Sequence, residues 1–95
     1  MHIISRKALA DFWDKHLDSK EALIRWHRIV ERSTFASFAE LRQTFPSADM
    51  VGRYTVFNIG GNKYRLITSI HYDHGKVYVR DVLMHQEYDQ ERWKK

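Results

Sequence analysis

The apolar side chains of the first third of the chain recur every three or four residues, the spacing of a buried helix face. A short, partly apolar run at residues 1–5 precedes them and predicts a strand, after which Ser5 can cap a helix that begins near Arg6. Asp18-Ser-Lys-Glu21 has the spacing of a capping box and predicts the start of a second helix. The predicted inward positions of the two helices are Leu9, Phe12, Trp13, His16, Leu17, Leu23, Trp26, Ile29 and Val30.

A third, shorter helix is predicted before Pro46. Ser37-Phe-Ala-Glu40 is another capping box, and the residue before a proline is disfavoured in helical geometry, so the helix ends there. Its apolar positions are Phe38, Leu41 and Phe45. The segment Ser47–Gly52 is predicted to be a loop.

From Arg53 onward, apolar and polar positions alternate with the period of a strand. The alternation predicts three strands rich in β-branched and aromatic residues: Tyr54–Ile59, Tyr64–Tyr72 and Val77–Leu83. Gly60-Gly61 and Asp73-His-Gly75 supply the turns between them. The polar segment His85–Trp93 predicts a terminal helix. Helices followed by strands predict an α+β fold, with N-terminal helices packed on a small antiparallel sheet and a short C-terminal helix.

The composition is that of one small basic domain over residues 1–95. Lys and Arg number 16 against 12 Asp and Glu, which gives a net charge of +4 and, with the many aromatics, weakly favours a nucleic-acid partner. The lack of cysteine excludes disulfides and thiolate zinc sites. Because the sequence shows neither a signal peptide nor a membrane-spanning run, we expect a soluble, cytoplasmic protein with no membrane partner.

Polar and basic side chains gather around the Gly60-Gly61 turn. They are Asn58, Asn62, Lys63 and Arg65. Arg65 lies within a strand among bulky apolar neighbours, where a cation needs a partner, and its planar guanidinium suits paired contacts with phosphate oxygens. His71 falls on the same strand face as Arg65 because the spacing is even. We therefore predict RNA binding by Lys63, Asn58, Asn62 and His71, although the asparagines can instead stabilise the turn.

Arg80 lies on the predicted strand next to that of Arg65. If both side chains emerge on one face, they form a phosphate clamp. The alternative is that each arginine pairs with a surface carboxylate such as Asp73 or Asp81.

His85 and Tyr88 follow the last predicted strand. His85 is the acid–base candidate because imidazole titrates near neutral pH, and Tyr88 can stack on a base or donate a hydrogen bond to a phosphate. The alternatives are an exposed or structural histidine and a tyrosine packed on the sheet. No His-Glu-x-x-His motif or acidic cluster is present, so we predict no metal site.

Several of these motifs resemble one family. The hairpin Val56–Ile67, followed by Val77-Tyr-Val-Arg80 and His85-Gln-Glu-Tyr-Asp89, is similar to the HigB-type toxins of the RelE-like group of bacterial toxin–antitoxin ribonucleases. The opening Met1–Ser5 and the Phe45-Pro-Ser47 stretch are also similar, so the resemblance covers nearly the whole chain. It implies helices packed on a small antiparallel sheet, and a ribosome-dependent endonuclease that cuts mRNA without a cofactor or metal. It also implies neutralisation by a helix-turn-helix antitoxin of the HigA-like kind.

Metal-free RNA cleavage requires deprotonation of the ribose 2′-hydroxyl, protonation of the leaving 5′-oxygen and neutralisation of the phosphorane. The side chains predicted to supply these functions are Arg65, Arg80, His85 and Tyr88. Two other functions stay open for the same residues. One is a non-catalytic RNA-binding module, and the other is a protein-interaction domain whose basic surface receives an acidic or amphipathic segment.

Overall fold

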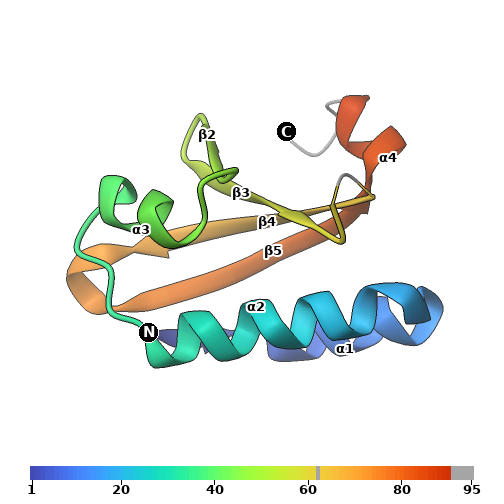
Figure 1. Cartoon of the computed structure of the whole chain (residues 1–95), viewed down its shortest axis with the longest axis horizontal. Helices are drawn as coiled ribbons and strands as arrows, with labels where there is room; N and C mark the ends of the chain where they lie inside the picture. Colours follow the sequence, from blue (N-terminus) through green and yellow to red (C-terminus); the bar gives the residue numbers. More distant parts are fainter. Residues whose placement is uncertain (62, 91–95) are drawn as a thin grey trace.

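The chain folds into a layer of helices against a sheet (Figure 1). The computed structural model describes residues 1–61 and 63–90. The helices are α1 (Arg6–Lys15), α2 (Lys20–Arg32), α3 (Phe38–Thr44) and α4 (His85–Asp89), with 3₁₀ turns at Leu17–Ser19 and Tyr72–His74. The strands are β1 (His2–Ile4), β2 (Asp49–Val51), β3 (Tyr54–Ile59), β4 (Tyr64–His71) and β5 (Lys76–Met84). The α+β prediction is confirmed.

The five strands form one sheet in the order β1-β5-β4-β3-β2. The pairs from β2 to β5 are antiparallel, as predicted. β1 adds a parallel edge beside β5, with Ile3 opposite Val77, so the complete sheet is mixed. The chain between β1 and its parallel partner β5 contains the helices α1 to α3 and the strands β2 to β4, which supplies the long connection that a parallel pair requires.

α1 and α2 lie side by side across one face of the sheet (Figure 1). The buried side chains at this interface include Leu9, Leu23, Trp26, Val30, Phe57, Leu66, Val77 and Val79. Successive residues of a strand point to opposite faces, so Arg65 and Ile67, on either side of Leu66, point away from these helices. We call the face that α1 and α2 leave uncovered the open face.

The predicted helix starts were partly right. Ser37 caps α3, because its Oγ accepts the Glu40 backbone N–H at 3.3 Å. Ser5 precedes α1 but makes no side-chain cap bond, and its φ of 74° is left-handed. α2 begins at Lys20, after a 3₁₀ turn, so the predicted capping box at Asp18 is wrong. Leu17 also lies in that turn and is 72% exposed, so its predicted inward position is wrong.

The Asp18 carboxylate instead ties this turn to the start of β4. Its Oδ1 accepts the Tyr64 hydroxyl hydrogen at 2.6 Å, and its Oδ2 lies 3.4 Å from the Lys63 Nζ. The hydrogen bond from Tyr64, with Lys63 adding to it, lowers the pKa of Asp18. The same hydrogen bond raises the pKa of Tyr64.

The predicted Ser47–Gly52 loop contains a strand. β2 forms a hairpin with β3, in which Asp49 lies opposite Val56, and Gly52 turns the chain with a φ of 60°. β2 has only three residues, two of them exposed, so it offers no alternation for a sequence pattern to detect.

An irregularity in the β4–β5 pairing determines which side chains share the open face. Ile67 lies opposite Asp81 and Thr68 opposite Val79, so Arg80 is the extra residue of a β-bulge. The bulge reverses the alternation of side chains along β5. Tyr78 and Arg80 therefore lie on the same side of the sheet as Leu83, which follows the bulge.

Candidate functional site

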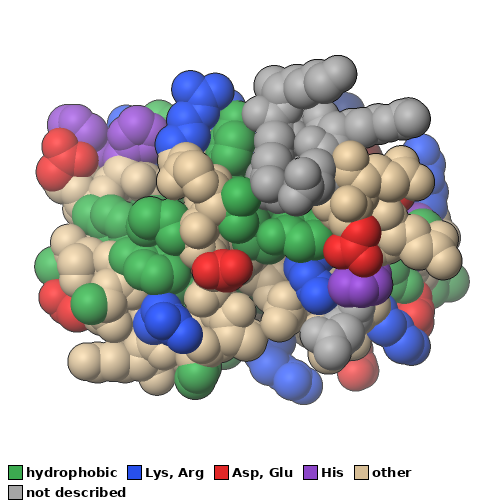
Figure 2. Space-filling model, turned by 90° about the horizontal axis from the view of Figure 1, so that it is seen from above, with side chains coloured by type: hydrophobic (Ala, Val, Ile, Leu, Met, Phe, Trp, Pro, Cys, Tyr) green, Lys and Arg blue, Asp and Glu red, His purple; other side chains and the backbone are tan. Residues whose placement is uncertain are grey.

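An apolar cluster occupies the middle of the open face. It consists of Val56, Ile67 and Leu83, with Val51, Tyr54 and Tyr88 packed against it. Figure 2 views the molecule from this side and shows hydrophobic side chains in a band, with basic and histidine side chains towards both of its ends. The polar candidates thus divide into two groups, one at each end of the apolar cluster.

Arg65 and Tyr88 meet at the end of the face where β4 begins and β5 ends. Arg65 lies between Asn58 of β3 and Leu83 of β5 in the register of the sheet and is half-buried. Its guanidinium carbon lies 5.5 Å from the centroid of the Tyr88 ring, and its Nη1 donates to the Tyr64 carbonyl at 3.2 Å. A ring and a backbone carbonyl thus fix a guanidinium that retains further N–H donors.

α4 brings His85 to the same end. The helix begins where β5 stops, and two backbone contacts fix its start: the His85 N–H donates to the Lys63 carbonyl at 3.0 Å, and the Met84 N–H to Glu87 Oε1 at 3.0 Å. His85 and Tyr88 are three residues apart and therefore adjacent on the helix surface. The structure thus brings Arg65, Tyr88 and His85 to one corner of the molecule.

Asp89 contacts the His85 imidazole. Its Oδ2 lies 3.2 Å from His85 Nε2, and the two side chains are 59% and 49% exposed. Sequence reasoning missed Asp89, although the spacing of four residues on a predicted helix was the available signal.

The remaining candidates near the Gly60-Gly61 turn are Asn58, Lys63 and Asn62. Asn58 is exposed and lies opposite Arg65 in the register. The ammonium of Lys63 is paired with Asp18 rather than with another site residue. Asn62 lies outside the described residues, as do residues 91–93 of the predicted terminal helix.

Arg80 and His71 lie at the other end of the open face. Arg80 Nε donates to Ser69 Oγ at 3.1 Å, and the rings of His71 and Tyr78 meet edge to face with centroids 5.2 Å apart. Ser69 is four residues beyond Arg65, about 13 Å along the strand. Arg65 and Arg80 therefore share a face, as the clamp hypothesis requires, but at separated positions.

The alternative ion pairs are not present in the part of the chain that the structure describes. Asp73 Oδ2 lies 3.5 Å from His74 Nε2 instead, and no carboxylate of residues 1–61 or 63–90 lies within 4.0 Å of the Arg65 or Arg80 guanidinium. Both arginines retain their positive charge for a ligand.

Asp81 is a further carboxylate on the open face. Its Oδ1 accepts the Val82 backbone N–H at 2.9 Å. Partial removal from water raises the pKa of Asp81, and the nearby carboxylate of Glu87 adds to this rise. Sequence reasoning treated Asp81 only as an ion-pair partner. The removal of its carboxylate from water depends on which residues pack around it in the fold, and a sequence pattern does not show this.

The described residues contain neither a cluster of metal ligands nor a membrane-spanning helix. In residues 1–61 and 63–90, no group of three or more His, Asp or Glu side chains is arranged to hold a metal ion. Within the same ranges, no helix has the length and apolar character to cross a bilayer.

Comparison with known proteins identifies the family. A family model described as HigB toxin, RelE-like toxic component of a toxin–antitoxin system, matches residues 19–91. The chain belongs to the HigB toxin family. Its relatives in this family include the mRNA interferase toxin HigB of Escherichia coli strain K12 and the mRNA interferase HigB of Shigella flexneri. Each is 34% identical over 92 residues, which cover 94% of this chain and 88% of the relative.

A more divergent HigB relative covers the same share of the chain. The mRNA interferase HigB of Escherichia coli O6:H1 strain CFT073 is 29% identical over 92 residues, covering 94% of this chain and 89% of its own length. The resemblance to HigB-type toxins is therefore confirmed. Membership in the HigB family carries with it an antitoxin partner, since the family description is that of one component of a toxin–antitoxin system.

Proposed function

We propose that this chain is a ribosome-dependent mRNA endonuclease, the toxin of a toxin–antitoxin pair, which cuts RNA through attack of the ribose 2′-hydroxyl. The observation that carries the proposal is the grouping of Arg65, Tyr88 and His85 at one end of the open face. The family description and the mRNA interferase names of the relatives support the substrate class.

Arg65 has the role of neutralising the phosphorane. The guanidinium has five N–H donors, of which one is directed to the Tyr64 carbonyl. The others remain for two non-bridging phosphate oxygens, and their contacts strengthen as negative charge develops in the transition state. Tyr88 holds the guanidinium in place through its ring and lies beside the phosphate that Arg65 binds.

His85 has the role of moving the protons. When Nε2–H is donated to Asp89, the lone pair is on Nδ1, which accepts the proton of the 2′-hydroxyl. The 2′-oxygen then bonds to phosphorus and the bond from phosphorus to the 5′-oxygen breaks. The 5′-oxygen takes a proton from a water molecule, the protonated His85 releases the 2′ proton to solvent, and the products are a 2′,3′-cyclic phosphate and a 5′-hydroxyl end.

The ribosome has the role of bending the message. Attack in line with the leaving oxygen requires the 2′-oxygen, phosphorus and 5′-oxygen to be aligned, which a relaxed RNA strand rarely achieves. The catalytic candidates lie on an open sheet face, so we assign the alignment to the ribosome that holds the message. The antitoxin is proposed to be a helix-turn-helix protein, and the test of this assignment is whether a reading frame for such a protein lies beside this one.

The test is cleavage of a reporter message in a translating extract, mapped by primer extension. Wild-type protein is expected to cut the message within codons, to leave cyclic phosphate ends and to stop cutting when initiation is blocked. His85→Ala is expected to abolish cutting, whereas Arg28→Gln, an exposed arginine on α2, retains it. An intact message with wild-type protein, together with RNA binding that survives His85→Ala, would instead support a non-catalytic RNA-binding module.

A further inference from the structure

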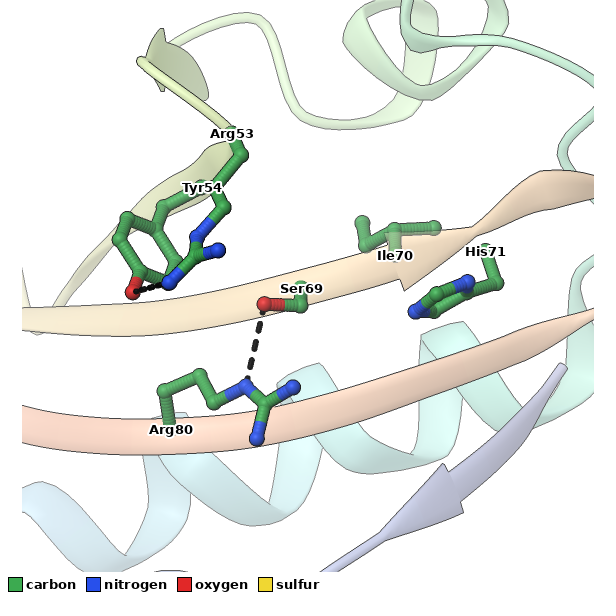
Figure 3. A pocket seen from close by; sticks show the side chains of 6 residues that line it. All are labelled: Arg53, Tyr54, Ser69, Ile70, His71 and Arg80. Atoms are coloured by element: carbon green, nitrogen blue, oxygen red, sulfur yellow. Dashed lines mark hydrogen bonds between the residues drawn. The ribbon is translucent and has the colours of Figure 1, made fainter.

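A cavity of about 540 Å³ lies on the open face at the end opposite Arg65 (Figure 3). It is lined by Arg53, Tyr54, Ser69, Ile70, His71 and Arg80. The residues come from the β2–β3 turn and from β3, β4 and β5, so the cavity is formed by the sheet itself. Its volume is within the range of small-molecule sites in proteins.

Two arginines in the cavity are held by neutral groups. Arg80 Nε donates to Ser69 Oγ at 3.1 Å, and Arg53 Nη2 donates to the Tyr54 hydroxyl at 3.2 Å (Figure 3). A hydroxyl fixes a guanidinium without cancelling its charge. In residues 1–61 and 63–90, no carboxylate forms an ion pair with either arginine, so the cavity carries two positive charges available to an anion.

Each guanidinium also lies over an aromatic ring. Arg53 is 5.3 Å from the Tyr54 ring centroid and Arg80 is 5.3 Å from that of Tyr78, whose ring meets His71 edge to face. The positive charges of the two guanidinium groups bind an anionic group, and the flat surfaces of these groups and of the rings stack on a planar aromatic group. The cavity therefore matches a ligand that has both groups. A nucleotide has both, whereas an acidic protein segment uses only the charge.

We infer that this cavity binds a nucleotide of the same RNA strand that is cut at Arg65, an inference that rests on the proposed function. Ser69, which holds Arg80, is about 13 Å along β4 from Arg65, farther than one stacked nucleotide step of about 3.4 Å. The cavity and Arg65 therefore contact different nucleotides. The buried apolar cluster of Val56, Ile67 and Leu83 lies between them and separates the two ends of the face.

The test uses wild-type protein and a 2′-O-methyl RNA of about eight nucleotides, which binds but lacks the attacking hydroxyl. Backbone amide NMR shifts are expected to change at Ser69, His71 and Arg80 as well as around Arg65. Arg53→Gln and Arg80→Gln are each expected to weaken binding about tenfold and to lower the salt slope of affinity by about 0.7, the value for one lost phosphate contact on a single strand. Arg28→Gln is the matched control and is expected to bind like wild type.

The outcomes separate this inference from the proposed function. Shift changes confined to the Arg65 end, with normal affinity in Arg53→Gln and Arg80→Gln, would overturn the cavity as a nucleotide site and leave the nuclease proposal standing. Changes at the cavity alone would support the inference and weaken the assignment of Arg65. An equal response of the cavity to a poly-glutamate peptide of matched charge would assign it to an acidic protein segment and overturn the inference.

Discussion

Replacement of Arg65 separates a catalytic role from a structural one, because the two losses differ in size. In Arg65→Ala the protein loses the cation–π contact with Tyr88 and one hydrogen bond to a backbone carbonyl. These contribute about 0.5–1 kcal/mol and about 1 kcal/mol. A loss of about 2 kcal/mol from a folding free energy of about 5–15 kcal/mol leaves the protein folded at 25 °C.

The expected loss in catalysis is larger. A preorganised donor that contacts developing charge in the transition state contributes about 10²- to 10³-fold to the rate, or about 2.7–4 kcal/mol. Arg65→Lys keeps the charge but cannot make the paired contact, so its rate is expected to fall between those of Arg65→Ala and wild type.

The assay is the initial rate of reporter mRNA cleavage in a translating extract, at equal concentrations of folded protein established by urea denaturation. Arg28→Gln removes an exposed arginine from the opposite side of the sheet and is the matched control. If Arg65→Ala cuts at more than about a tenth of the wild-type rate, Arg65 does not stabilise the transition state and the reasoning fails.

Three further predictions concern stability. Leu66→Ala, at a fully buried position, is expected to lower the free energy of unfolding by about 2–5 kcal/mol, and a smaller loss in urea denaturation would mean that the core closes around the gap. The lowered pKa of Asp18 stabilises the fold above its unfolded value of 3.8, and this stabilisation disappears as pH falls through the lower folded pKa. The stability difference between wild type and Asp18→Asn should therefore shrink in acid, and a difference that is constant with pH would contradict this. The raised pKa of Asp81 acts in the opposite direction, so wild-type stability falls as pH rises from 3.8 through the raised value, and Asp81→Asn should be the more stable protein at neutral pH. Equal unfolding midpoints there would rule that out.

Local patterns predicted most elements of the fold, because a helix face and a half-buried strand each have a period that a short window contains. Ser37 was correctly assigned as a cap since its partner, Glu40, is three residues away. Asp18 has the same spacing to Glu21, but its carboxylate is held by Tyr64, 46 residues along the chain. Interactions over such separations are invisible to a local pattern, and the parallel pairing of β1 with β5 was missed for the same reason.

The candidate site depends on one such long-range feature, the bulge at Arg80. Val77 and Val79 face the helices, so an unbroken alternation along β5 would also turn Asp81 and Leu83 towards the helices. The extra residue reverses the alternation: Val82 packs in the helix-covered core and Leu83 in the open-face cluster. The bulge also determines where α4 lies. This helix starts two residues after Leu83, so the bulge places Tyr88 on the side of the sheet where Arg65 lies. Arg80, the bulged residue itself, also remains on that side, against Ser69. A single extra residue in β5 thus places the candidate side chains at both ends of the sheet on the same side of it. The sequence of β5 contains no glycine or other signal from which the position of the bulge could be predicted.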